Sequence, residues 1–171
     1  DGRTQEKVAL LKRLDSPHVG VCVDTGNNLA LLEDPADTVA ALAPWAYSVH
    51  LKDMAVAEYP DGFLLSEVPL GEGFLDLPKI VDTLRRAQPD VRFNLEMITR
   101  NPLKVPCLKD AYWSTFDSLP GRQLARALAL VRHQQPKQSL PTLDGLPREQ
   151  QVAREEENVR KSLAHARHQL L

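Results

Sequence analysis

Short runs of hydrophobic residues alternate along this chain with longer segments in which hydrophobic residues recur every three or four positions. The short runs predict buried strands at residues 19–24, 46–53 and 91–98. The longer, periodic segments predict helices at residues 4–14, 35–45, 74–88, 121–134 and 147–170. Because short strands alternate with helices, we expect an α/β fold with a parallel sheet built from βα units.

Individual residues mark some of the predicted boundaries. Thr4 has the side chain of an N-cap and is predicted to start the first helix. Asp76 is predicted to cap the helix within residues 74–88, with Pro78 in its first turn. Residues 54–73 contain a Pro-Asp-Gly turn and end in two closely spaced glycines, which predicts a long connection.

The last part of the chain has a different character. Residues 135–146 are rich in proline and polar residues and predict a linker, which makes residues 1–134 a single domain. Residues 147–171 predict a charged helical tail in which hydrophobic residues are too sparse for a strong core face. Charges of both signs at helical spacing indicate a solvated helix, and docking on a partner is the alternative.

Composition excludes several classes of partner. At 171 residues the chain is long enough for one domain, and its net charge of −2 gives no electrostatic reason to expect nucleic acid or an anionic membrane. No stretch approaches the roughly 18 to 20 continuous apolar residues of a membrane span. Cys22 and Cys107 lack metal-type spacing, and Cys22 is predicted to be buried in a strand. We therefore expect a cytoplasmic protein.

Each predicted strand ends in a side chain that can bind a metal ion. Asp24, His50 and Glu96 each follow a hydrophobic run, and ligands of parallel sheets bind beyond the carboxyl ends of the strands. This donor set suits Mn²⁺, Mg²⁺, Co²⁺ or Zn²⁺. Taken singly, Asp24 can be a turn or cap residue and His50 a core histidine, whereas an unpaired buried carboxylate at Glu96 is costly. The shared position of the three favours one divalent metal ion.

Four segments together carry a family resemblance. In order, they read "GVCVDTGN", "SVHLKD", "PLGEGFLDLPKIVDTL" and "FNLEM". They resemble the last three strands of the xylose isomerase-like TIM barrels, the superfamily of sugar phosphate isomerases and epimerases, over about residues 1–134. The resemblance implies a partial (β/α)8 barrel of roughly three to four βα units, followed by a C-terminal helical extension.

The resemblance also implies roles for single residues. Asp24, His50 and Glu96 match three metal ligands, and Glu96 additionally matches a carboxylate that moves a proton on the substrate. Asn27 stands at a substrate-contacting position where many epimerases carry histidine. Lys52, a substrate-binding candidate, and Asp53 continue the His-x-Lys-Asp signature, and Asp53 is expected to orient His50 or a neighbouring loop.

Further side chains near the strand ends are weaker candidates. Arg100 and Lys104 follow the last strand, where Arg100 can pair with a substrate carboxylate or phosphate, and a solvated loop is the alternative. Tyr112, Trp113 and Phe116 either cover the site or, as we favour, pack the helix that follows. Glu67, in the long connection, is a minor candidate for lining the site.

One metal ligand of the family has no counterpart in the chain. A glutamate is expected at the end of a strand just before the helix that opens at Thr4, and the sequence has no such strand. A partial barrel leaves sheet edges open. We therefore expect either a piece of a longer protein or a half that depends on a partner, namely a second copy or the N-terminal half of the same barrel.

These observations lead to one preferred function and three alternatives. The preferred function is a divalent-metal-dependent isomerase or epimerase acting on a sugar, sugar phosphate or sugar acid through an enediolate. A decarboxylase or dehydratase on the same scaffold is a further alternative that ranks below the non-catalytic module named last. A phosphodiesterase of the endonuclease IV kind needs several zinc ions and more well-placed histidines than His50 alone. A truncated, non-catalytic module that binds a partner is the alternative from a different class.

Overall fold

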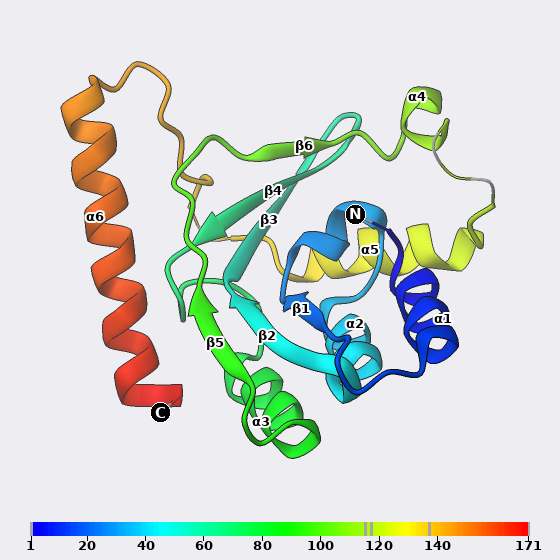
Figure 1. Cartoon of the computed structure of the whole chain (residues 1–171). Coiled ribbons are helices and arrows are strands. Elements are labelled where there is room, and N and C mark those ends of the chain that lie inside the picture. The colour runs from blue at the N-terminus through cyan, green and yellow to red at the C-terminus, as the bar shows by residue number, and fades with distance from the viewer. Residues whose placement is uncertain (1, 115, 117, 137, 171) are drawn as a thin grey trace.

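The computed structural model describes residues 2–114, 116, 118–136 and 138–170. Its strands form two three-stranded sheets, one parallel and one antiparallel, with helices packed around them (Figure 1). A long C-terminal helix lies beside the edge formed by the last parallel strand (Figure 1). The parallel sheet carries the candidate metal ligands, and the antiparallel sheet supplies one wall of the pocket beside them.

The parallel sheet confirms the three predicted strands, each in a shorter form. It consists of β1 (Val21–Asp24), β2 (Ala46–Leu51) and β5 (Arg92–Leu95), in the order β1-β2-β5. Asp24 pairs with His50, and His50 pairs with Asn94 on the next strand. This register brings the carboxyl ends of the three strands to one edge of the sheet.

The two faces of the parallel sheet differ in polarity. One face carries Val23 and Val49, which are fully buried beneath α1 (Thr4–Leu14), α2 (Pro35–Leu42) and α3 (Leu77–Ala87) in a common core. The opposite face carries Cys22, which is exposed. The prediction of a buried Cys22 is therefore wrong, because in a strand it shares the face of Asp24, two residues on, rather than that of Val23.

Side-chain caps set the starts of two helices. Asp76 accepts a hydrogen bond from the Lys79 N–H and caps α3, as predicted, and Asp34 caps α2. The predicted N-cap Thr4 is wrong by one position, because Arg3 is the N-cap and Glu6 accepts a hydrogen bond from its backbone N–H. Short 3₁₀ helices, η1 (Asn27–Leu31) and η2 (Ala43–Trp45), follow β1 and α2.

The antiparallel sheet corrects the prediction of a long connection. Residues 54–73 instead contribute β3 (Asp53–Tyr59) and β4 (Gly62–Val68), which form a hairpin closed at Pro60–Asp61. A third strand, β6 (Leu103–Val105), pairs with β4. The glycine at 62 is required because its φ is 152° and a β-carbon would lie 2.2 Å from the Val105 carbonyl oxygen.

A second core fills the space between this sheet and α5 (Gly121–His133). The short α4 (Asp110–Trp113) packs against that core, where the Tyr112 hydroxyl donates to the Ala30 carbonyl and the Trp113 indole N–H donates to the Cys107 carbonyl. Phe116 packs against both rings at tilted angles. These aromatic side chains therefore pack the second core, the favoured reading of the sequence, rather than covering the site.

The charged tail forms a docked helix. It comprises α6 (Arg148–His165) and a π-helical turn, η3 (Ala166–Leu170), whose Leu170 is buried in the first core. The covered residues of α6 recur at helical spacing and are mostly polar, namely Gln151, Glu155, Asn158, Val159, Ser162 and His165. The helix therefore docks on its own chain through hydrogen bonds, which differs from the solvated helix expected. Among the described helices, none has the length and apolar character needed to cross a membrane.

Candidate functional site

Three neighbouring strand ends bring Asp24, His50 and Glu96 together. The strand ladder continues past the ends of the strands, because the Thr25 N–H donates to the His50 carbonyl and the Glu96 N–H to the Leu51 carbonyl. Each of the three side chains offers one donor atom, and these atoms lie within 4.8 Å of one another. The structure therefore places the three predicted ligands in one group.

Asp24 serves the turn and the group at the same time. Its Oδ1 accepts hydrogen bonds from the N–H groups of Gly26 and Asn27, at 2.9 and 2.7 Å, which forms the turn after β1. Its Oδ2 lies 3.0 Å from the Lys52 ammonium. The turn role and the ligand role were alternatives in the sequence, and the geometry allows both because each uses a different oxygen.

His50 faces the open side of the sheet. Its Nδ1 lies 3.0 Å from Oε2 of Glu96, and the side chain is 48% exposed. This exposure differs from that of a core histidine. The contact leaves an imidazole and a carboxylate side by side at the mouth of the pocket.

Lys52 places a buried ammonium among the carboxylates. Its side chain is 1% exposed, and its Nζ lies 2.9 Å from Glu96 Oε2 and 3.6 Å from Glu67 Oε1, in addition to the contact with Asp24. Burial lowers the pKa of Lys52, but Glu96, Asp24 and Glu67 outweigh it, so the net shift is upward and the group stays charged. This position differs from the one predicted for Lys52, which was a contact with the substrate. The buried ammonium lies behind the carboxylates instead.

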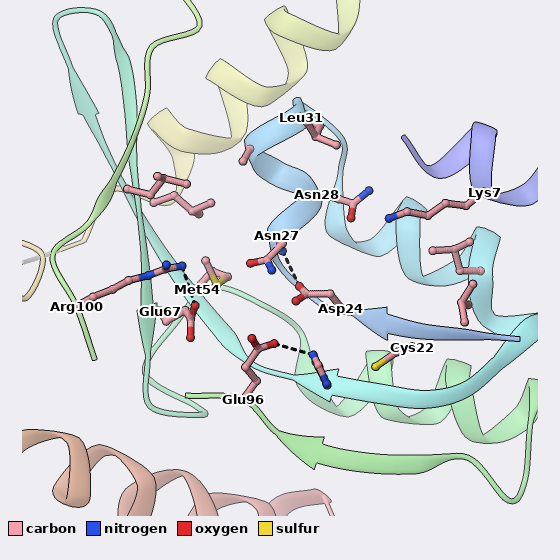
Figure 2. A pocket seen from close by; sticks show the side chains of 16 residues that line it. Lys7, Cys22, Asp24, Asn27, Asn28, Leu31, Met54, Glu67, Glu96 and Arg100 are labelled. Atoms are coloured by element: carbon pink, nitrogen blue, oxygen red, sulfur yellow. Dashed lines mark hydrogen bonds and ion pairs between the residues drawn. The ribbon is translucent and has the colours of Figure 1, made fainter. Parts of the chain in front are cut away.

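A cavity of about 620 Å³ opens over the group. Figure 2 shows Asp24 and Asn27 on one side of it, with Glu67 and Arg100 on the other and Glu96 between them. The Arg100 guanidinium lies 3.2 Å from Glu67 Oε1 and is 53% exposed. The cavity therefore has a basic side chain within reach of a ligand on the wall opposite Asp24.

Two of the weaker candidates have opposite outcomes. Glu67 lines the cavity with a side chain that is 1% exposed, because β4 delivers it to the carboxyl end of the parallel sheet. Lys104 lies on β6 next to Leu103, which lines the cavity, and successive strand residues point to opposite faces. Lys104 is thus exposed and directed away from the cavity, and the prediction that it reaches the site is wrong.

The donor set fits a divalent metal ion. Two carboxylates and one imidazole match the preferences of Mg²⁺, Mn²⁺, Co²⁺ and Zn²⁺. Oε2 of Glu96 lies 2.9 Å from the Lys52 ammonium and 3.0 Å from Nδ1 of His50. The group therefore already holds one positive charge, and its donor atoms lie close enough together to bind one metal ion.

Sequence comparison gives the family. The model of the xylose isomerase-like TIM barrel family matches residues 1–133 of the 171 in the chain. The chain belongs to this family. The match ends at α5, so α6 lies outside it.

Two individual proteins resemble this family member over part of its length. A 3-oxo-isoapionate decarboxylase of Pectobacterium atrosepticum is 35% identical over 85 residues, which cover 48% of this chain and 31% of the relative. A xylose isomerase-like TIM barrel protein from Mycobacterium smegmatis, crystallised in complex with magnesium, aligns with a TM-score of 0.51 and 21% identity. That alignment covers 74% of this chain and 41% of the other. The matched segment therefore spans about a third of the curated relative. The structural alignment supports a TIM-barrel-like fold for this chain.

Asp53 organises the loop beside the candidate ligand group. Its carboxylate accepts hydrogen bonds from the backbone N–H groups of Gly71, Gly73 and Leu75, and from its neighbour Met54. Burial raises the pKa of Asp53, and these N–H groups oppose that rise. Of the two expected roles, orienting His50 or a neighbouring loop, the contacts correspond to the loop.

Replacing Asp53 with alanine is expected to lower the free energy of unfolding by about 2–4 kcal/mol, because buried N–H groups lose their acceptor. Urea denaturation measures this change. Asp37→Ala is the matched control, since Asp37 is exposed on α2. An Asp53→Ala protein as stable as the control would contradict the assigned role.

Proposed function

We propose that this chain forms the metal-binding part of a divalent-metal-dependent enzyme that acts on an oxygen-rich carboxylic acid of the sugar-acid class. The observation that carries the proposal is the group formed by Asp24, His50 and Glu96, whose donor atoms lie within 4.8 Å of one another. The exposed guanidinium of Arg100, on the far wall of the same cavity, supports a negatively charged substrate.

Decarboxylation of a 3-oxo sugar acid is the first reaction to consider. The similarity to a 3-oxo-isoapionate decarboxylase supports it, although the matched segment is 31% of that enzyme. In this reaction the bond to the carboxyl carbon breaks, CO₂ leaves, and the electron pair forms an enolate that takes up one proton at carbon. Asp24, His50 and Glu96 would hold a divalent ion, which would supply positive charge to polarise the substrate carbonyl.

The chain's own residues have distinct tasks in this scheme. Arg100 binds the negative charge of the substrate, and Lys52 holds the carboxylates of Asp24 and Glu96 in place. Oε2 of Glu96 faces Lys52 and His50, so Oε1 is the oxygen that can move a proton at the substrate carbon. Asn27, exposed at the cavity wall, is placed to contact a substrate hydroxyl.

Isomerisation or epimerisation of a sugar is the second candidate. The Glu96 carboxylate favours this candidate as well, because isomerisation and epimerisation both begin with removal of a proton next to a carbonyl. Epimerisation needs two proton-transferring groups on opposite faces of the substrate, whereas decarboxylation needs one proton donor. We therefore place decarboxylation first.

The proposal includes assembly with further strands. A TIM barrel has eight parallel strands, and in this proposal β1, β2 and β5 correspond to three of them, with β1 and β5 at the edges of their sheet. A second copy of this chain, or the N-terminal half of the barrel from other residues of a longer protein, can complete the sheet. A non-catalytic module that uses these edges only for binding is the competing view.

The test combines metal content, size and turnover. We expect the purified chain to bind Mn²⁺ with about one ion per chain in an oligomer, and to release CO₂ from a 3-oxo sugar acid. Isomerisation or epimerisation, the second candidate, is tested by measuring proton exchange at the substrate carbon by NMR in D₂O with sugar substrates. A metal-free monomer without either activity would overturn the proposal and favour the non-catalytic module.

Arg100→Met gives a sharper kinetic prediction within this test. Because the carboxylate loses its charge as CO₂ forms, the guanidinium stabilises the bound substrate at least as well as the transition state. We expect KM to rise about 10- to 100-fold with kcat little changed. Arg126→Met, on the outer helix α5, is the control, and a loss confined to kcat would contradict the assigned role.

A further inference from the structure

The C-terminal extension, defined here as residues 138–170, binds the chain on both sides of Arg100. Residues 96–102, which follow β5 and include Arg100, are in neither a helix nor a strand. Their position therefore depends on side-chain contacts rather than on a regular backbone ladder. The family match ends at residue 133, so the extension is a feature of this chain beyond the matched region.

On one side of Arg100, α6 binds Thr99. The Thr99 N–H donates to Oε2 of Glu155 at 2.8 Å, and Asn158 donates from Nδ2 to the Thr99 hydroxyl at 2.9 Å. Both contacts are partly buried, and Glu155 and Asn158 lie on the covered face of the helix. A hydrogen bond to a charged acceptor is stronger than a neutral one, so Glu155 is the stronger of these two contacts.

On the other side of Arg100, the loop before α6 binds Asn101. Oδ1 of Asn101 accepts hydrogen bonds from the Leu143 N–H at 2.7 Å and the Thr142 hydroxyl at 2.9 Å. Its Nδ2 donates to Asp144 at 2.7 Å. Arg154 on α6 donates to the Thr142 carbonyl, which joins this loop to the helix.

On the inner side of the segment, Glu67 completes the arrangement. Its Oε2 accepts the Ile98 N–H at 2.8 Å, and its Oε1 pairs with the Arg100 guanidinium. Successive backbone N–H groups, those of Ile98 and Thr99, are thus bound by carboxylates from β4 and α6. Figure 2 shows the Arg100 side chain extended from this segment toward Glu67 and the cavity.

We propose that the C-terminal extension sets the position of Arg100 and so determines how tightly the cavity binds the negatively charged group of its ligand. The inference rests on the proposed function, in which Arg100 binds that charge. Arginine loses much conformational freedom when it is ordered. Binding of Thr99 and Asn101 by the extension fixes the backbone beforehand, which reduces the entropy lost on ligand binding. Glu155 is accordingly a positioning residue.

A purely structural role for the extension predicts a different pattern. Leu170 lies in the first core, and Ser162 accepts the Leu70 N–H, so parts of the extension stabilise the fold away from Arg100. Glu155 and Asn101 contact the Arg100 segment itself. Their loss should therefore weaken anion binding beyond any effect on stability.

The experiment compares Glu155→Ala with Glu156→Ala, the same change on the exposed face of the same helix. The probe is malonate, a stable analogue of a 3-oxo acid, titrated by calorimetry into the Mn²⁺-loaded chain, with neutral malonamide alongside. We expect Glu155→Ala to bind malonate about tenfold more weakly, as the loss of one charge-assisted hydrogen bond implies. Malonamide and Mn²⁺ affinities should stay the same, and Glu155→Gln, which retains an acceptor, should recover part of the loss.

Hydrogen exchange over residues 97–101, without metal or probe, gives a second readout. We expect faster exchange there in Glu155→Ala and in Asn101→Ala, whose side chain is exposed and whose loss leaves the core intact. If the wild-type chain binds no Mn²⁺, the proposed function fails, and the exchange data alone decide whether the extension holds the segment. Equal malonate affinity in Glu155→Ala and Glu156→Ala, or unchanged exchange in both test variants, would overturn the inference.

Discussion

Replacing Lys52 with methionine is expected to lower the free energy of unfolding by about 3–5 kcal/mol when no divalent ion is present. Methionine fills much of the same space, so the change removes the charge rather than the packing. Without the ammonium, the carboxylates of Asp24, Glu67 and Glu96 lose the cation that lies 2.9 to 3.6 Å from each of them. The mutual repulsion of these carboxylates then destabilises the folded arrangement that holds them close together.

Lys109→Met is the matched control for this substitution. Lys109 pairs with Asp61 at 3.0 Å, but both side chains are substantially exposed, at 59% and 40%. An exposed pair of this kind contributes at most about 1 kcal/mol. Urea denaturation of both variants separates a buried charge effect from the general loss of a lysine.

Added Mn²⁺ should distinguish the variants further. A divalent ion that binds only the folded state stabilises it. In Lys52→Met that ion also takes over the charge of the missing ammonium, so we expect a larger rise in melting temperature with Mn²⁺ than in the wild type. A Lys52→Met protein with wild-type stability in the absence of Mn²⁺ would contradict the role assigned to the ammonium.

The parallel sheet was predictable because its signals are local. The hydrophobic runs before Asp24, His50 and Glu96 mark the strands, and the parallel arrangement then requires their ends to meet at one edge. Chemistry and position agree in these short segments. The face of Cys22 was also accessible from the sequence, because alternation from Asp24 places it on the open side.

The antiparallel hairpin has one local signal in the sequence, the Pro-Asp-Gly turn at residues 60–62. The runs on each side of this turn, residues 53–59 and 62–68, pair over their full length. Six of the seven residues of β4 are buried, so that strand lacks a clean alternation of polar and apolar residues. The hairpin matters for the site because it delivers Glu67 to Lys52 and Arg100.

The docking of α6 could not be predicted from the sequence. Its covered face is made of polar residues, which look the same in the sequence as residues facing water. Glu155 meets the Thr99 N–H 56 positions away, and Ser162 meets the Leu70 N–H 92 positions away. Hydrogen bonds between such distant residues leave no periodic pattern, whereas hydrophobic contacts do.

Replacing His50 with alanine is expected to weaken Mn²⁺ binding by more than about 100-fold, since even partners that only orient a metal ligand contribute about 10- to 100-fold. His50 offers the one imidazole in the donor group, and the remaining carboxylates of Asp24 and Glu96 both lie against Lys52. Without the imidazole, the ion keeps two protein ligands, and each of them shares its negative charge with the Lys52 ammonium. His133→Ala, an exposed substitution at the end of α5, is the matched control and should leave Mn²⁺ affinity unchanged.

Glu96→Gln separates charge from shape in the same assay. Glutamine retains an oxygen at this position but removes the negative charge, and it leaves Lys52 facing one carboxylate fewer. We therefore expect Glu96→Gln to lose about as much Mn²⁺ affinity as His50→Ala does. Turnover per bound ion should fall further in Glu96→Gln, because Glu96 also moves a proton. Isothermal titration calorimetry gives the affinity, and turnover is normalised to bound metal. Wild-type Mn²⁺ affinity in both variants would show that the ion binds elsewhere, and the group at the strand ends would lose its assigned role.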